Sequence, residues 1–376
     1  MKRHFCARLL PLALALALLC GCTVTPLEKP EVPDPVPLPV PAVSTEPEED
    51  ADRPADEPEE TQPAGDQPED TQPGDTQPED TPPAEEDPQE PDTPQEPDTP
   101  QEEDPFTEYP AFPEGISLAS GQAFVYDLDQ GGIVAMKGAG EKLYPASVTK
   151  LLTILTAEQY VTMDQLITPG DEQSLVASDS SIAYVNSSHT LTAEQLIEGM
   201  LLPSGNDAAN ALAAAAGRNL ANDQSLSGVD AVQVLVGAMN EYAAELGMTS
   251  SHFVTVDGYL DEDHYSTVED MARLSVAAAQ DEIIRRYCGL AADDVTYYSG
   301  DTIRWMNSNQ MLNPESVWYS PYVTGMKTGS LSYNLSLVCT LEKDGRHYVA
   351  GVFTAADNQA RYGDMTTIVN WLFGGE

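Results

Sequence analysis

The stretch that decides the fold is LSLVCTLEKDGRHYVAGVFTA, residues 335–355. Two apolar runs flank the dipeptide Asp344–Gly345, which is a frequent turn between antiparallel strands. A second pair of apolar runs, in QAFVYDLDQGGIVAM at residues 122–136, surrounds another glycine-containing turn. The sequence therefore predicts one β-hairpin near each end of a common globular region.

The segment between the hairpins has the apolar periodicity of helices. A last helix is expected over MTTIVNWLF, residues 365–373. This order predicts an α+β fold, with an antiparallel sheet from both chain ends, flanked by helices, plus a helical lobe. Four helix-boundary signals are expected: capping boxes at Thr192–Gln195 and Ser266–Glu269, and C-terminal glycines at Gly217 and Gly247.

The first 22 residues have the pattern of a targeting segment. Three basic residues precede LLPLALALALL, residues 9–19, which is too short for a confident membrane span. The run ends in LCGC, which resembles a bacterial lipobox. In that case the mature protein begins at Cys22 and is lipid-anchored to the outer face of the bacterial cell membrane. An ordinary signal peptide is the alternative.

Residues 23–108 cannot form a hydrophobic core. They contain 22 of the 30 prolines, with 29 acidic against 2 basic residues. This composition predicts a disordered acidic tether. A low-complexity spacer whose length is not under selection fits the same composition. Residues 109–376, which are expected to fold as one globular domain, contain 33 acidic and 12 basic residues, a net charge of −21. Nucleic-acid binding, which needs clustered Lys and Arg, is therefore not expected.

A serine and a lysine lie about one helical turn apart in YPASVTKLLTILTAE, residues 144–158. Pro145 suits a first helical turn, which would place Ser147 near the helix N-terminus and Lys150 on the same face. Apolar neighbours predict burial, which lowers the pKa of a lysine. A neutral amine can then accept the proton of the serine hydroxyl. The alternative is a capping serine beside a lysine that extends to solvent.

Two other short motifs carry polar groups. PSGND, residues 203–207, places Ser204 and Asn206 between two expected helices, where they can face a cleft or simply form a turn. In VTGMKTGSLS, Lys327 and Thr328 lie on an expected strand and can bind a carboxylate. Gly329 would let a ligand approach the backbone, whereas an edge lysine that blocks strand pairing is the alternative.

These motifs together resemble the serine-type D-alanyl-D-alanine carboxypeptidases, the low-molecular-mass penicillin-binding proteins. The resemblance spans about residues 115–373 and includes YPASVTKLLT, LLPSGNDAANALA, MNEYAAELGMTSSHF, HYSTVEDMARL, NSNQML and GMKTG. It implies a β-lactamase/transpeptidase-like fold that removes the terminal D-alanine from peptidoglycan stem pentapeptides during cell-wall maturation. It also implies β-lactams as covalent inhibitors, and neither cofactor nor metal.

The resemblance implies catalytic roles for three side chains. Ser147 would be the nucleophile, Lys150 its base, and Ser204 the relay that returns a proton to the leaving amine. The oxyanion hole would be the backbone N–H groups of Ser147 and Ser330. The implied substrate-binding set is Asn206 for the substrate amide, Lys327 and Thr328 for the terminal carboxylate, and Gly329 and Ser330 along the strand.

Three other functions fit the sequence less well. A class A-like β-lactamase needs a carboxylate for deacylation, usually in Glu-x-x-Leu-Asn, which is absent between Asn206 and Lys327. A non-catalytic binder of stem peptides would not need the intact catalytic positions. A metallopeptidase is disfavoured because the five histidines form no His-Glu-x-x-His cluster, and His264 is expected to be structural.

Cys288 and Cys339 are the two cysteines after the targeting segment. They could form one disulfide in an oxidising compartment or remain buried thiols. Cys339 lies in the apolar run LSLVCTL, which favours a buried thiol.

Overall fold

The computed structural model describes residues 104–332 and 334–374. The expected targeting segment with Cys22, and nearly all of the expected tether, lie outside the described residues. Among the helices that are described, none combines the length and apolarity that crossing a bilayer requires.

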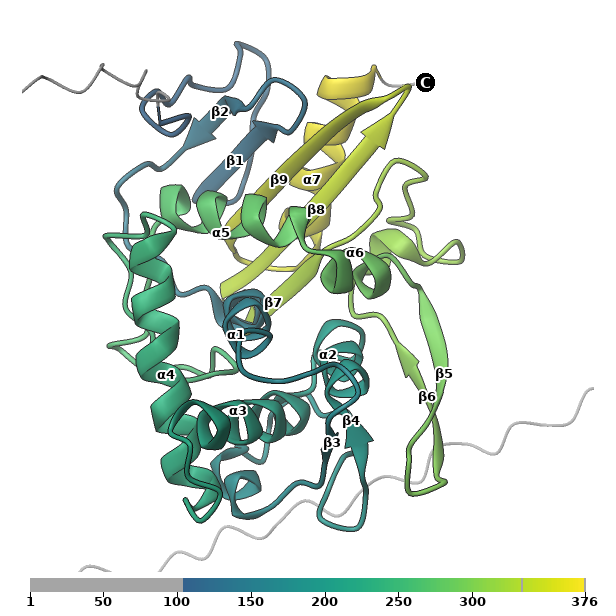
Figure 1. The fold of residues 1–376 in the computed structure, drawn as a ribbon. Coiled ribbons are helices and arrows are strands. Elements are labelled where there is room, and N and C mark those ends of the chain that lie inside the picture. Colours follow the sequence, from purple (N-terminus) through teal and green to yellow (C-terminus); the bar gives the residue numbers. More distant parts are fainter. Residues whose placement is uncertain (1–103, 333, 375–376) are drawn as a thin grey trace, which may run out of the picture. The chain divides into compact units, whose positions relative to one another are not determined.

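A five-stranded antiparallel sheet forms from both ends of the described region, in the order β2–β1–β9–β8–β7 (Figure 1). β1 (Gln122–Asp127) and β2 (Gly132–Lys137) are the first hairpin, and β8 (Asn334–Lys343) and β9 (Arg346–Ala355) are the second. β1 pairs with β9, and β7 (Lys327–Leu331) is an edge strand. The predicted hairpins and the α+β class are confirmed.

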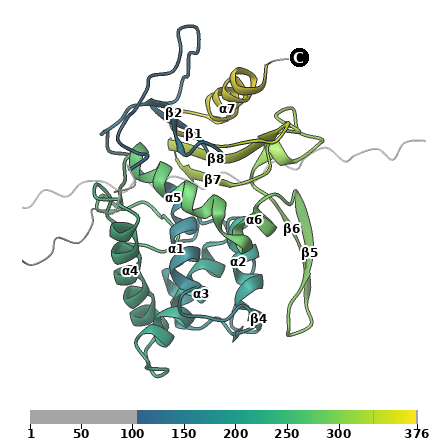
Figure 2. The ribbon, with the colours of Figure 1, turned by 45° about the horizontal axis from the view of Figure 1, so that its top comes forward.

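Helices cover both faces of this sheet. α7 (Asn358–Phe373) lies on one face, and α5 (Val268–Gln280) crosses the other (Figure 2). Side chains of β1 alternate between two hydrophobic cores: Phe124 joins the core shared with the helical lobe, whereas Val125 joins the core beneath α7. The sheet is therefore buried on both sides, as its nearly continuous apolar strands indicate.

The helical lobe forms from the segment between the hairpins. Its helices are α1 (Lys150–Ala157), α2 (Ala193–Leu201), α3 (Asn206–Leu220), α4 (Gly228–Glu245) and α6 (Glu282–Cys288). The smaller elements are β3 (Leu166–Ile167), β4 (Leu191–Thr192), β5 (Ala292–Thr296), β6 (Thr302–Met306) and the 3₁₀ turns Ala146–Thr149, Asp171–Leu175 and Gln310–Leu312. Every residue of α1 is buried, so this helix lies inside the lobe.

The two expected capping boxes had different outcomes. At α2 both hydrogen bonds of the Thr192–Gln195 box are present. The box expected at Ser266 is wrong, because Thr267 caps α5 instead and its Oγ1 accepts from the backbone N of Asp270. Ser266 and Thr267 are adjacent hydroxyl residues, and each is followed three positions later by an acid. The sequence therefore offered two equivalent N-caps for this helix.

The two expected terminal glycines also differ. Gly247 follows α4 with a φ of +77°, a conformation that favours glycine after a helix. Gly217 does not end α3, which continues to Leu220. A Cβ at Gly217 would lie 1.9 Å from the carbonyl oxygen of Ala231 on α4, so this glycine allows the two helices to pack closely.

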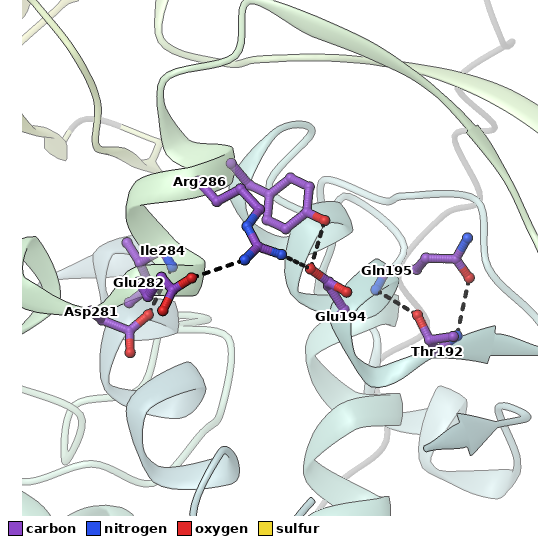
Figure 3. Close-up of polar contacts among 8 residues, drawn as sticks. Thr192, Glu194, Gln195, Asp281, Glu282, Ile284 and Arg286 are labelled. Carbon is purple, nitrogen blue, oxygen red and sulfur yellow. Dashed lines mark hydrogen bonds and ion pairs between the residues drawn. The ribbon is translucent and has the colours of Figure 1, made fainter. Parts of the chain in front are cut away.

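Polar contacts join α6 to α2 (Figure 3). Arg286 donates to Glu194 on α2 at 2.6 Å and to Glu282 at 3.1 Å, and the Tyr287 hydroxyl also donates to Glu194, at 2.9 Å. Asp281 is the N-cap of α6. Exposed ion pairs each contribute little to stability, so these contacts mainly orient α6 on α2.

The fold begins before residue 109, the start expected from the sequence. Phe106 is buried and stacks on Tyr126 with ring centroids 5.3 Å apart. Asp104 pairs with Arg273 at 2.7 Å. One aromatic residue at the end of an acidic run changes the composition too little to mark this boundary.

The two cysteines of the described region are buried free thiols. The buried thiol predicted for Cys339 is thereby confirmed. Burial also raises the pKa of the Cys339 thiol to about 12, which keeps this side chain protonated and unreactive at neutral pH.

Candidate active site

A cavity of about 370 Å³ opens beside Ser147, between the C-terminal end of β7 and two loops of the helical lobe. One loop contributes residues 179–181 and the other residues 257–260. Ser330, Leu331 and Ser332 form the wall at β7. The nucleophile candidate thus lies on the wall of a space that can hold a small peptide.

Ser147 lies in the 3₁₀ turn Ala146–Thr149, immediately before α1, and not inside that helix. Ala146 has a φ of +52°, a left-handed conformation that is strained for a residue with a side chain. The turn leaves Ser147 half-buried at the cavity and makes Lys150 the first residue of α1.

Lys150 is fully buried and close to Ser147. Its Nζ donates to Ser147 Oγ at 2.9 Å, Asn206 Oδ1 at 2.7 Å and the carbonyl oxygen of Asp257 at 3.0 Å. Burial lowers the pKa of Lys150 to about 8, and the charges of Asp257 and Asp207 limit this fall. The predicted buried lysine is confirmed, and the solvent-extended alternative is wrong.

These three contacts suit both protonation states of Lys150. As an ammonium, it donates to all three oxygens. As a neutral amine, it keeps two N–H groups for Asn206 and Asp257, and its lone pair can accept the hydroxyl proton of Ser147. The two fixed acceptors therefore orient the lone pair toward Ser147.

Asn206 is the first residue of α3 and faces the same site. Its Oδ1 accepts from Lys150, while its Nδ2 donates to Ser180 Oγ at 3.0 Å. Its backbone N donates to the carbonyl of Ser181 at 2.8 Å. Hydrogen bonds with Ser180 of the cavity loop and with Lys150 therefore fix the orientation of the Asn206 side chain.

Lys327 and Ser204 form a second buried pair. Lys327 Nζ donates to Ser204 Oγ at 2.7 Å and to the carbonyl of Thr328 at 3.1 Å. Burial, followed by the charges of Lys150 and Arg361, holds the pKa of Lys327 well below its usual value. Because its ammonium is disfavoured when the site is empty, an incoming anion would stabilise the charged form.

Gly329 brings β7 against the nucleophile turn. A Cβ at this position would lie 2.7 Å from the carbonyl oxygen of Pro145 and 3.1 Å from the Cβ of Ala146. The expectation was that this glycine lets a ligand approach the backbone. In the structure, the missing side chain of Gly329 instead allows the turn that carries Ser147 to pack against β7.

Two residues that fix β7 were not predicted from the sequence. Arg361, buried on α7, donates to the carbonyl of Gly329 at 3.1 Å and to Ser330 Oγ at 3.0 Å. Ser308 shares a 2.6 Å hydrogen bond with Thr328. Arg361 belongs to no short motif, whereas Ser308 lies in NSNQML and could have been singled out there.

His264 is structural, as expected. Its Nδ1 accepts from the backbone N of Val254 at 3.2 Å, and its Nε2 lies 2.8 Å from Thr149 Oγ1. Burial lowers the pKa of His264 to about 4, so the ring stays neutral. Across the described ranges 104–332 and 334–374, no three His, Cys, Asp or Glu side chains gather where they could hold a metal ion.

Comparisons with known proteins agree with this geometry. Residues 107–357 match the family model described as D-alanyl-D-alanine carboxypeptidase. The chain is 25% identical over 256 residues to the D-alanyl-D-alanine carboxypeptidase DacF of Bacillus subtilis, covering 67% of this chain and 61% of the relative. It is 29% identical over 260 residues to DacC of Escherichia coli, covering 66% and 59%. The chain therefore spans about three-fifths of the length of these curated relatives.

A solved structure is also similar. The crystal structure of the Streptomyces K15 DD-transpeptidase matches with a TM-score of 0.61 and 25% sequence identity. The match covers 69% of this chain and 98% of that chain. The described region thus has the fold of a DD-transpeptidase.

Proposed function

The chain belongs to the D-alanyl-D-alanine carboxypeptidase family, and on that premise we propose that it removes the terminal D-alanine from peptidoglycan stem pentapeptides. The reaction passes through an acyl-enzyme on Ser147, which penicillins also form. The observation that carries this proposal is the buried amine of Lys150, 2.9 Å from the hydroxyl of Ser147 at the cavity wall.

The first step is acylation. Ser147 Oγ attacks the carbonyl carbon between the two D-alanines, and the hydroxyl proton moves to the neutral amine of Lys150. Backbone N–H groups of Ser147 and Ser330 stabilise the resulting oxyanion. The C–N bond then breaks, and the leaving amine receives a proton through Ser204. Water afterwards hydrolyses the ester on Ser147.

Substrate orientation follows from the charges. Lys327 and Thr328 receive the terminal carboxylate, and binding of this anion favours the ammonium form of Lys327. Asn206 holds the amide on the acyl side. Gly329 and Ser330 lie along the strand against which the peptide backbone extends. Peptidoglycan stem peptides are therefore the partners, and β-lactams are covalent inhibitors.

The test is mass spectrometry of the purified protein. Wild type should release D-alanine from a pentapeptide stem and gain the mass of penicillin on the peptide that contains Ser147. Ser147→Ala should lose both activities, because no other hydroxyl replaces the nucleophile. Full activity in Ser147→Ala, or a penicillin adduct elsewhere, contradicts the assignment. Rapid turnover of penicillin would instead identify a β-lactamase.

We also propose that Cys22 carries a lipid that anchors the chain to the outer face of the cell membrane. The support is the basic segment, the short apolar run and the LCGC sequence that ends at residue 22. Labelled palmitate should be incorporated in cells and lost in Cys22→Ser. Equal labelling of both proteins, or none of wild type, refutes the anchor.

A further inference from the structure

A second cavity, of about 540 Å³, is separate from the catalytic cavity. Its walls come from the C-terminal end of α5, from α6, and from β8 and β9 near the turn that joins them. Among the described residues, none lines both cavities. The volume lies within the range of small-molecule sites, roughly 300–1,000 Å³. This second cavity is therefore large enough for a ligand of its own.

The second cavity combines apolar and polar side chains. Buried Leu341 and Tyr348 contribute apolar surface, whereas Gln280, Arg285 and Glu342 are exposed and polar. Ligand pockets usually have this composition, in which a few polar groups fix the orientation of the ligand. The class of ligand therefore depends on which polar groups are still available.

Arg285, on α6, has no acidic partner in the described part of the chain. Its neighbour Arg286 instead points toward α2 and pairs with Glu194 and Glu282 (Figure 3). An unpaired arginine is unexpected where residues 109–376 contain 33 acidic and 12 basic residues. A guanidinium can present two parallel N–H donors to a carboxylate. Arg285 is thus available to hold the carboxylate of a ligand.

The two acids of this cavity differ in what they already bind. Both oxygens of Asp129 are occupied by His347, whose backbone N donates at 2.8 Å and whose Nδ1 lies 2.8 Å away. Glu342 makes a weaker contact, because its Oε1 lies 3.9 Å from His347 Nε2, beyond hydrogen-bond distance. The side-chain amide of Gln280 has no partner within residues 104–332 and 334–374. The available groups are therefore one cation, one anion and one amide.

We propose that the second cavity binds short peptides that carry both a free carboxylate and a free ammonium group. Arg285 holds the carboxylate, Glu342 the ammonium and Gln280 a peptide amide, while the side chains of the peptide cover the apolar wall. An anion without a positive charge would meet Asp129 and Glu342 uncompensated, and a cation without a negative charge would meet Arg285. A ligand with both charges satisfies both groups at once.

The test compares three peptides by amide chemical-shift titration of the full chain. L-Alanyl-L-leucine carries both charges, its N-acetyl form lacks the ammonium, and its C-terminal amide lacks the carboxylate. Because the charged groups are exposed, wild type should bind the first peptide about three- to tenfold more tightly than either derivative. The shifts should centre on residues 280–288 and 340–348, and the preference should shrink as salt increases.

Two variants should give opposite patterns. Arg285→Gln should lose the preference over the C-terminal amide and keep that over the N-acetyl peptide, because only the partner of the carboxylate is missing. Glu342→Gln should do the reverse. Arg286→Gln is the matched control, since it removes the same charge from the same helix but does not line the cavity. It should bind the three peptides as wild type does.

Equal affinity of wild type for the three peptides, or an unchanged pattern in Arg285→Gln, overturns the proposal. Shifts centred on Ser147 also overturn it, because they would place the peptide in the catalytic cavity. Binding is measured without turnover, so the result is independent of the carboxypeptidase assay. The spectra of each variant also report whether it is folded.

Discussion

At Lys150, burial and neighbouring charge act in opposite directions. Removal from water lowers the pKa to about 8, while Asp257 and Asp207 favour the charged form. Near neutral pH most of the amine is therefore protonated. The fraction that can accept the proton of Ser147 grows as pH rises through about 8.

The rate of penicillin acylation should follow this titration. It should rise about tenfold per pH unit well below pH 8 and level off above it, because only the neutral amine acts as a base. Lys150→Ala should lower the rate by about 10²–10⁴-fold. Stopped-flow measurement from pH 6 to 9.5 gives the profile, and circular dichroism checks that the variant folds. A flat profile for wild type argues against this base.

Residues that share a short motif could be predicted, and residues joined only by the fold could not. Ser147 and Lys150 lie three positions apart, so one turn of chain brings them together. Arg361 reaches Ser330 from α7, and the Tyr259 hydroxyl reaches Asp179 across two loops. No local pattern marks such partners, because their proximity depends on the completed packing of sheet and lobe.

At the scale of elements, the contact between α3 and α4 depends on a missing side chain. Gly217→Ala should lower the free energy of unfolding by about 1–3 kcal/mol, because the added Cβ meets backbone that must shift. Gly237→Ala is the control, since Gly237 is exposed on α4 and a Cβ there would meet no heavy atom within 4 Å. It should stabilise the protein by about 0.5–1 kcal/mol.

Urea denaturation of both variants measures this difference. A similar change in stability for the two substitutions would show that close packing at Gly217 is unimportant.

The same contact explains why the helix end at Gly217 was predicted wrongly. Glycine signals a helix terminus from sequence, but here its small size serves packing between helices. Hairpins were easier to predict, because Asp344–Gly345 fixes both the turn and the register of its strands.

At the scale of the whole molecule, the buried acid Glu198 and the half-buried acid Glu158 make stability depend on pH. Burial, together with the neighbouring carboxyl of Asp281, raises the pKa of Glu158 to about 8. Burial and Asp293 do the same for Glu198, also to about 8. Between the ordinary glutamate pKa of 4.5 and about 8, the folded state holds protons that the unfolded chain has lost. Stability contributed by these groups is therefore present at low pH and lost as pH rises toward 8.

The double variant Glu158→Gln, Glu198→Gln should remove much of this dependence, because an amide does not titrate. Its Tm should fall less than that of wild type between pH 5.5 and 8.5 in differential scanning fluorimetry. Glu241→Gln, an exposed position on α4, serves as the control and should keep the wild-type slope. Parallel slopes for the double variant and wild type would show that these two acids do not set the pH dependence.

The closure of one sheet by both ends of the chain has a consequence for biosynthesis. Residue 122 on β1 faces residue 353 on β9, so a ribosome must make more than 200 further residues before the first hairpin gains its second neighbour. Until then one strand edge stays open to other chains, and folding waits for a distant partner. β7, the strand that carries Lys327, likewise has no partner strand until β8 has been synthesised. A nascent chain can therefore carry Ser147 for much of its translation without being able to react.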